Sequence, residues 1–204
     1  MFTGLIQQTA FVVNNIQTQD GKTLKIRLAN IDGIKIGDSI AINGCCLTVT
    51  HIAGNELSFY ISKETLKQTT LMMLSTNDRI NIETAMLAST PLGGHIVLGH
   101  VDEVARVILI ENVQNTYKVI IEVSNTGRKF IIRKGSIAID GISLTIMGIQ
   151  GKRIELNIIP HTWKNTNLSL LDTSDGLSNS LVNVEFDHFV KIISKKIDEH
   201  FADR

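Results

Sequence analysis

Short stretches in which apolar and polar residues alternate run along most of the chain. The alternation has period two over residues 24–28, 39–42, 57–61, 117–123 and 154–158. This period is typical of a strand with one buried face. Pairs of turn-forming residues such as Asp20-Gly21, Asn43-Gly44 and Gly151-Lys152 separate the stretches. Short strands divided by tight turns predict small closed barrels of about six strands each.

The sequence contains two copies of one unit. Residues 39–49 match residues 136–146 without a gap at an offset of 97, and the match continues to Leu71 and Leu168. Looser similarity joins residues 80–83 to residues 181–185, and Gly4 to Gly99. A unit of nearly a hundred residues is too long for a solenoid repeat and has the size of a small domain. We predict an all-β protein made of tandem duplicated barrels, one in residues 1–95 and one in residues 96–187.

A different pattern marks residues 188–204. Phe189, Ile193, Ile197 and Phe201 recur every four residues, and charged residues fill the other side. This spacing predicts an amphipathic helix. Its apolar face could pack on the chain's own barrel or against copies of itself in an oligomer, and the sequence supports both interpretations.

The composition excludes several classes of protein. Lys plus Arg number 20 and Asp plus Glu number 20, so the net charge is zero and the basic surplus of a nucleic-acid binder is missing. Hydrophobic residues make up 43% and only 2 residues are proline, which argues against a disordered chain. No apolar run is long enough to span a membrane.

The cysteines and the N-terminal residues indicate a cellular compartment. Cys45 and Cys46 are the only cysteines, and neighbouring strand residues point to opposite faces, so a disulfide between them would strain the backbone. The first residues lack the basic and apolar regions of a secretory signal. We expect a cytoplasmic protein.

Three familiar catalytic or binding motifs are incomplete in this sequence. Residues 94–100 have glycines spaced as in a phosphate loop, but histidine stands where lysine is required. His95 and His100 are five residues apart, so on one strand they would face opposite sides and make a poor metal pair. Asp140, Ser143 and His161 could be imagined as a triad, but only geometry defines one. We expect no metal site.

Polar residues at matched places in the two copies suggest a ligand. Cys46 and Thr48 align with Ser143 and Thr145, and residues i and i+2 of a strand share a face. A buried core face seldom carries two polar side chains in both copies unless something pairs with them. We predict that these faces contact ligand, and that the chain holds two copies of one ligand or two similar ligands. Glu64-Thr65 and His161-Thr162 form a second matched pair.

An ordered set of motifs along nearly the whole chain resembles the riboflavin synthases of the alpha-chain type. The motifs are Met1-Phe2-Thr3-Gly4, Asn43-Gly44-Cys45-Cys46-Leu47-Thr48-Val49-Thr50, Lys63-Glu64-Thr65-Leu66, Gly93-Gly94-His95, Gly99-His100-Val101-Asp102, Lys134-Gly135-Ser136, Asp140-Gly141-Ile142-Ser143-Leu144-Thr145 and Ile159-Pro160-His161-Thr162.

The resemblance implies two six-stranded Greek-key barrels, each binding one 6,7-dimethyl-8-ribityllumazine. It implies a homotrimer held together by the C-terminal helices, with the active site between the N-terminal barrel of one subunit and the C-terminal barrel of a neighbour. The reaction would be a dismutation in which one lumazine gives a four-carbon unit to the other, without metal or redox cofactor. Association with lumazine synthase is a further expectation.

Carried over position by position, the resemblance also names site residues. The catalytic candidates are Phe2, Ser39, Cys46, Thr48, His100, Asp140, Ser143 and Thr145. The substrate-binding candidates are Gly4, Leu5, Ile6, Cys46, Leu47, Thr48, Tyr60, Ile61, Ser62, Lys63, Glu64, Thr65, Gly99, His100, Val101, Lys134, Ser143, Leu144, Thr145, Asn157, Ile158, Ile159, Pro160, His161 and Thr162. Lys134 would reach the site of a neighbouring subunit.

One residue departs from the family pattern, and two rival functions stay open. Trp163 stands where many family members carry leucine. A non-catalytic lumazine protein of the same fold would bind the ligand as an optical antenna without turning it over. A purely structural tandem barrel would bind no ligand at all.

Overall fold

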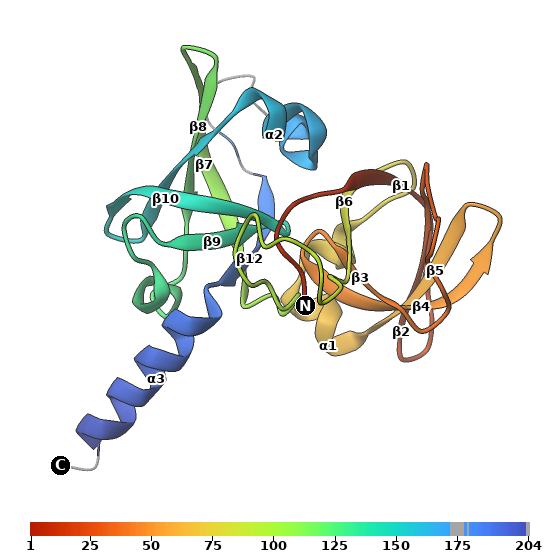
Figure 1. Ribbon diagram of the computed structural model, residues 1–204, viewed down its shortest axis with the longest axis horizontal. Coiled ribbons are helices and arrows are strands. Elements are labelled where there is room, and N and C mark those ends of the chain that lie inside the picture. The colour runs from red at the N-terminus through yellow and green to blue at the C-terminus, as the bar shows by residue number, and fades with distance from the viewer. Residues whose placement is uncertain (172–177, 179, 203–204) are drawn as a thin grey trace.

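Two closed barrels and one C-terminal helix make up the protein (Figure 1). The computed structural model describes residues 1–171, 178 and 180–202. The barrels lie side by side, and the helix α3 (His188–Ala202) projects away from the C-terminal barrel (Figure 1). No helix in the described residues is long and apolar enough to cross a membrane.

The N-terminal barrel closes from antiparallel strands in the ring order β1-β2-β5-β4-β3-β6. Its strands are β1 (Gln8–Gln17), β2 (Gly21–Arg27), β3 (Ser39–Ile42), β4 (Cys45–Ala53), β5 (Glu56–Ser62) and β6 (Arg79–Thr84). The short helices α1 (Lys63–Gln68) and η1 (Thr70–Met73) connect β5 to β6.

The C-terminal barrel repeats this ring, with β7, β8, β11, β10, β9 and β12 in the places of β1, β2, β5, β4, β3 and β6. Its elements are β7 (Glu103–Val113), β8 (Thr116–Glu122), η2 (Gly127–Phe130), β9 (Ser136–Ile139), β10 (Ile142–Gln150), β11 (Arg153–Ile158), α2 (Pro160–Asn165), η3 (Asn167–Leu170) and β12 (Leu181–Phe186). The predicted fold, tandem six-stranded barrels with a C-terminal helix, is confirmed.

Local sequence signals set the ends of the short helices. The Ser62 hydroxyl accepts a hydrogen bond from the Thr65 amide at 3.2 Å and so caps α1. Pro160 lies in the first turn of α2, where its missing N–H costs nothing. Trp163 of α2 stacks on Tyr117 with ring centroids 4.0 Å apart, so this departure from the family pattern packs against the C-terminal barrel.

Alternation along the strands separates core from surface. On β4, Cys45, Leu47 and Val49 are buried in the core of the N-terminal barrel, whereas Cys46 is half-buried and Thr48 is exposed. Burial also raises the pKa of the Cys45 thiol to about 12, so this cysteine behaves as a small core residue. Each barrel has its own apolar core of this kind.

The β3–β4 and β9–β10 hairpins meet turn to turn between the barrels. Asn43 and Asp140 have positive φ angles, 43° and 45°, and each is followed by a glycine, as predicted for one tight turn used twice. A Cβ on Gly44 would lie 2.6 Å from the Gly141 nitrogen. Close contact between the two barrels therefore requires glycine at this point.

A buried network of amide side chains joins the two turns. The Asn81 amide N–H donates to Asn43 Oδ1 at 2.7 Å, and the Asn183 N–H donates to Asp140 Oδ1 at 2.8 Å. Each asparagine side chain then reaches across, Asn81 Nδ2 to the Asp140 carbonyl at 3.0 Å and Asn183 Nδ2 to the Asn43 carbonyl at 2.8 Å. These matched pairs fix the barrels relative to one another.

Three further hydrogen bonds strengthen the junction. The Asn167 amide N–H donates to Asn81 Oδ1 at 2.7 Å, and the Thr70 N–H donates to Asn183 Oδ1 at 2.8 Å. Asn167 Nδ2 also donates to Asp140 Oδ2 at 2.8 Å. Burial nevertheless raises the pKa of Asp140 to about 6, because the hydrogen bonds only partly offset the loss of water.

Asn81→Ala should lower the free energy of unfolding by about 2–4 kcal/mol, because it leaves a buried carbonyl and a buried amide without partners. The measurement is urea unfolding followed by circular dichroism. The matched control is Asn55→Ala, at an exposed turn, which should change stability by less than about 0.5 kcal/mol. Equal stability of both variants would contradict the importance of the network.

Candidate functional site

The outward faces of two matched hairpins carry five of the eight predicted catalytic residues, Ser39, Cys46, Thr48, Ser143 and Thr145. On the N-terminal barrel, Ser39 of β3 lies opposite Thr48 of β4, and Ala41 lies opposite Cys46. On the C-terminal barrel the same positions hold Ser136 opposite Thr145 and Ala138 opposite Ser143. The polar pairs therefore share a face as predicted, and this face lies outside the barrel core.

Each hairpin is covered by the segment that precedes the other barrel. We call these two segments, residues 1–4 and 95–100, the crossing segments. Residues 1–4 lead into the N-terminal barrel, yet the Gly4 carbonyl accepts a hydrogen bond from the Ser143 amide at 2.8 Å. Residues 95–100 lead into the C-terminal barrel, yet the Gly99 carbonyl accepts one from the Cys46 amide at 2.9 Å. The two segments also pair with each other, since the Phe2 N–H donates to the Val97 carbonyl at 2.7 Å.

We define two half-sites from these contacts. The N-barrel half-site contains Ser39, Cys46, Thr48, Gly99 and His100, and the C-barrel half-site contains Gly4, His95, Ser136, Ser143 and Thr145. Gly4 and Gly99 have φ angles of +76° and +80°. A Cβ on either would clash with the strand that the segment crosses, 2.6 Å from Ser143 Cβ and 2.5 Å from Cys46 Cβ. Both positions need glycine.

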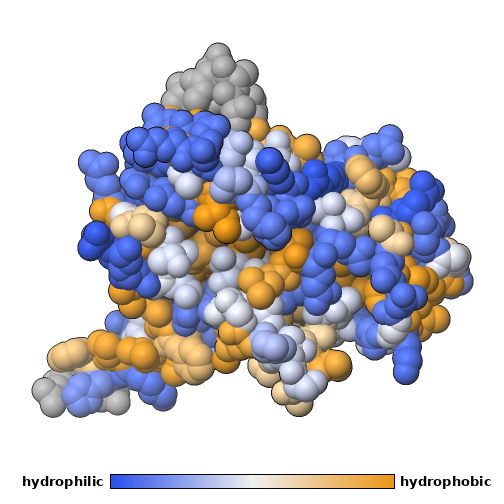
Figure 2. Space-filling view, turned by 45° about the horizontal axis from the view of Figure 1, so that its top comes forward, coloured by the Kyte–Doolittle hydropathy of each residue, from blue (hydrophilic) through white to orange (hydrophobic). Residues whose placement is uncertain are grey.

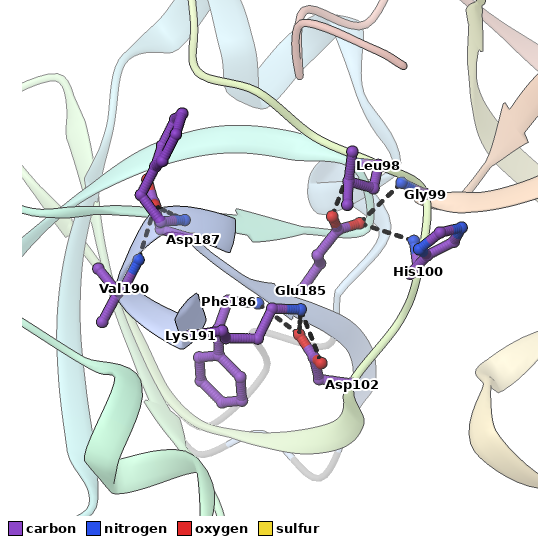
Figure 3. Close-up of polar contacts among 10 residues, drawn as sticks. Leu98, Gly99, His100, Asp102, Glu185, Phe186, Asp187, Val190 and Lys191 are labelled. Carbon is purple, nitrogen blue, oxygen red and sulfur yellow. Dashed lines mark hydrogen bonds and ion pairs between the residues drawn. The ribbon is translucent and has the colours of Figure 1, made fainter. Parts of the chain in front are cut away.

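A buried carboxylate holds the crossing segment of the N-barrel half-site. Glu185 of β12 accepts the Leu98 amide N–H at 2.7 Å and those of Gly99 and His100 at 2.9 Å each (Figure 3). Burial raises the pKa of Glu185, and the nearby Lys191 ammonium and the three amide bonds oppose that rise. The backbone of His100 is thereby fixed while its side chain stays exposed.

Glu83 of β6 does the same for the C-barrel half-site. Its Oε1 accepts the Thr3 amide N–H at 2.6 Å and the Thr3 hydroxyl at 2.7 Å, and its Oε2 accepts the Gly4 N–H at 3.0 Å. Burial raises its pKa too, against these hydrogen bonds. Each of the two glutamates therefore accepts three hydrogen bonds from a crossing segment, and the two segments are held in the same way.

A histidine distinguishes the C-barrel half-site. His95 Nδ1 lies 2.7 Å from Ser143 Oγ, and only 8% of the histidine is exposed. Burial lowers the pKa of the His95 imidazole, and the Asp187 carboxylate opposes this shift. No described side chain forms an equivalent hydrogen bond to the Cys46 thiol.

Two predicted catalytic residues lie behind the half-sites. Phe2 is fully buried in a small cluster with Ala41, Val97 and Ala138, between the two hairpins. Asp140 is buried in the amide network, with both carboxylate oxygens occupied. Neither side chain faces solvent, so any effect of these residues on a reaction is exerted through their neighbours.

The remaining predicted residues flank the hairpins. Residues 60–65 form the end of β5 and the start of α1, and residues 157–162 occupy the matching place in the C-terminal barrel. Tyr60 is 47% exposed, and its hydroxyl donates to the Asp20 carbonyl. Lys134 lies in the turn before β9 with a φ of +67°, and its ammonium contacts Met147 Sδ.

Glu83, Glu185 and His95 are not among the site residues predicted from the sequence. A signal for the two glutamates existed, because they end the loosely repeated segments 80–83 and 181–185. His95 lies in one of the motifs that carry the family resemblance, but its approach to Ser143 depends on the crossing of the segments. Within the described residues, no group of three histidine, cysteine or acidic side chains could hold a metal ion.

Comparison with known proteins shows that the chain belongs to the family of lumazine-binding domains. The family model "Lumazine binding domain" matches residues 3–85 and again residues 98–187. The riboflavin synthase of Actinobacillus pleuropneumoniae is 36% identical over 202 residues, covering 98% of this chain and 93% of that protein. That of Escherichia coli strain K12 is 36% identical over 207 residues, covering 100% and 95%.

Solved structures of similar fold contain bound ligands. LumP complexed with 6,7-dimethyl-8-(1'-D-ribityl) lumazine superposes with a TM-score of 0.81 at 26% identity, covering 91% of this chain and 99% of that one. LumP complexed with riboflavin gives a TM-score of 0.83 at the same identity and coverage.

Glu185→Gln should loosen residues 98–100, because glutamine offers one uncharged acceptor oxygen in place of two charged ones. A hydrogen bond to a charged group contributes about 1.5–3 kcal/mol, so amide exchange of these residues should accelerate about tenfold or more. Hydrogen exchange with mass spectrometry measures this. The matched variant Glu83→Gln should loosen residues 3–4 instead; if either variant loosened both segments equally, the two carboxylates would not act separately.

Proposed function

Because this chain belongs to the riboflavin synthase family, whose lumazine-binding domain it carries twice, we propose that it catalyses the dismutation of two 6,7-dimethyl-8-ribityllumazine molecules. One molecule gives a four-carbon unit to the other. The products are riboflavin and 5-amino-6-ribitylaminouracil. The reaction needs no metal or redox cofactor, since the second substrate molecule is the acceptor.

The observation that carries this proposal is the pair of matched half-sites in one chain. Ser39, Cys46 and Thr48 recur as Ser136, Ser143 and Thr145 on the same face of equivalent hairpins. A reaction that consumes two identical molecules requires two related binding places. Holding both molecules in a fixed mutual orientation can lower a barrier by about 7–11 kcal/mol.

The N-barrel half-site supplies a thiol and an imidazole. Cys46 is half-buried on β4, and His100 is exposed beside it on the fixed crossing segment. We assign Cys46 the role of nucleophile or polarising donor at one lumazine. His100 accepts the proton lost from the acidic 7-methyl group, since imidazole is the side chain that most often serves as a general base.

The C-barrel half-site handles the partner molecule through Ser143 and Thr145. We place Phe2 and Asp140 among the positioning residues, because both are buried behind the hairpins. Asp140 fixes the turn three residues before Ser143, and Phe2 supports the crossing segments. Ser39 lies beside Thr48 and completes the N-barrel half-site.

The flanking stretches 60–65 and 157–162 are the proposed binding sites for the rest of each lumazine. Serine, threonine, lysine and asparagine side chains in these stretches provide hydrogen-bond donors and acceptors for a ribityl chain. Lys134 is assigned to the site of a neighbouring subunit. By sequence, residues 1–95 and 96–187 are the two lumazine-binding units.

Residues 188–204 are proposed to assemble the chain into a homotrimer. On α3, Phe189, Ile193, Ile197 and Phe201 are each at least half exposed, and no described residue of the helix is buried. Figure 2 shows hydrophobic surface along the projecting helix. An apolar face left uncovered by the described residues supports packing against copies of α3, and a trimer would bring an N-barrel half-site to a neighbour's C-barrel half-site.

Two expectations about the cellular setting belong to the same proposal. We infer a cytoplasmic enzyme, consistent with free Cys45 and Cys46. Association with lumazine synthase, which would supply the substrate, stays a prediction.

Purified protein given only 6,7-dimethyl-8-ribityllumazine should form riboflavin at half the rate of lumazine loss. The change in absorbance on riboflavin formation measures this without any added cofactor. Binding without riboflavin formation would instead indicate a non-catalytic lumazine-binding protein of the same fold. If the protein neither bound nor converted the lumazine, the interpretation as a purely structural tandem barrel would remain.

Ile193→Glu together with Ile197→Glu should convert the trimer to a monomer, because charge on the apolar face of α3 opposes burial. Light scattering coupled to gel filtration should give three times 22.5 kDa for the wild type and 22.5 kDa for the double variant. Lys195→Glu, on the opposite side of α3, is the control and should stay trimeric. A monomeric wild type would overturn the proposed assembly.

A further inference from the structure

The strongest chemical difference between the two half-sites is the contact between His95 and Ser143. His95 Nδ1 and Ser143 Oγ are 2.7 Å apart, the length of a good O–H to nitrogen hydrogen bond. The aligned cysteine, Cys46, has no such partner among the described residues. The two copies of the unit thus differ in how firmly the side chain at this position is held.

His95 is itself held by the crossing segment of the C-barrel half-site. Its amide N–H donates to the Thr3 carbonyl at 3.1 Å, and Thr3 is bound through its own N–H and hydroxyl to Glu83. A continuous set of contacts therefore runs from Glu83 through Thr3 to His95 and on to Ser143. A side chain fixed by a second layer of contacts in this way is suited to orient a reacting group.

The charges around His95 favour the neutral imidazole. Burial lowers its pKa, and the Asp187 carboxylate at the start of α3 opposes this only in part. The Glu83 carboxylate is occupied by Thr3 and Gly4, and no direct bond from it to His95 is formed. A neutral imidazole with its proton on Nε2 has a free lone pair on Nδ1 that accepts the serine proton.

We propose that His95 is a positioning residue for Ser143, and that it makes the C-barrel half-site different from the N-barrel half-site. The Ser143 hydroxyl donates to His95 Nδ1, so its oxygen lone pairs are fixed toward the bound lumazine and accept a hydrogen bond from a ligand N–H or O–H group. The inference rests on the proposed function, since it names a further residue of that site.

The test compares the wild type with His95→Ala, His95→Asn, Ser143→Ala and the double variant His95→Ala/Ser143→Ala. Asparagine places its Oδ1 near the position of Nδ1 and can accept the serine proton, but it cannot titrate. His51→Ala, on the exposed part of β4, is the matched control. Riboflavin formation gives kcat and KM, and circular dichroism confirms that each variant is folded.

Loss of orientation predicts a fall in kcat of about tenfold to a hundredfold for His95→Ala, with KM changed by less than about threefold. His95→Asn should recover kcat to within about fivefold of the wild type, and the double variant should be no slower than Ser143→Ala, because the two residues act as one unit. His51→Ala should behave as the wild type. Unchanged kcat in His95→Ala, no recovery in His95→Asn, or additive losses in the double variant would overturn the proposal.

A second measurement is independent of turnover. A long-range proton–nitrogen NMR spectrum of the ligand-free protein reports the state of the His95 ring, and Ser143→Ala should shift its Nδ1 signal by removing the donor. An inactive wild type with this shift would refute the riboflavin synthase function but keep the contact between His95 and Ser143. An unchanged Nδ1 signal would refute the inference itself.

Discussion

The exchange of leading segments between the two barrels is the constraint on which the rest of the structure depends. The Gly4 carbonyl of residues 1–4 binds the C-terminal barrel, and the Gly99 carbonyl of residues 95–100 binds the N-terminal barrel. A buried glutamate of each segment's own barrel, Glu83 or Glu185, holds the segment in this position. Neither half-site can form from one unit alone. A buried carboxylate that accepts three hydrogen bonds is stable in this position, whereas removing its partners would leave an expensive unpaired charge.

Duplication and exchange together explain how one chain serves a two-substrate reaction. The hairpins give each half-site the same hydroxyl or thiol positions, and their turns meet at Gly44 and Gly141. The half-sites then diverge in detail, with His100 exposed in one and His95 buried against Ser143 in the other. Two half-sites with the same backbone but different side chains suit a reaction in which the donor and the acceptor of the four-carbon unit are two copies of one compound.

Much of this could be predicted from the sequence, and the limits have physical causes. Period-two alternation and the gapless repeat indicated two barrels, and Asn43-Gly44 with Asp140-Gly141 indicated matched turns, because these depend on local conformation. The roles of Glu83, Glu185 and His95 could not be derived, since their partners lie about fifty to eighty-seven residues away in sequence and depend on the crossing. Asp140 and Phe2 were assigned to catalysis by resemblance, whereas only the fold reveals that they are buried.

The presence of two half-sites in one chain is tested most directly by the number of lumazine molecules that the chain binds. Titration with 6,7-dimethyl-8-ribityllumazine under conditions of slow turnover, followed by equilibrium dialysis, gives this number. Two crossed half-sites predict two molecules per chain, with one site weakened by Cys46→Trp and the other by Ser143→Trp. A single molecule per chain, abolished by either substitution, would contradict the existence of two half-sites.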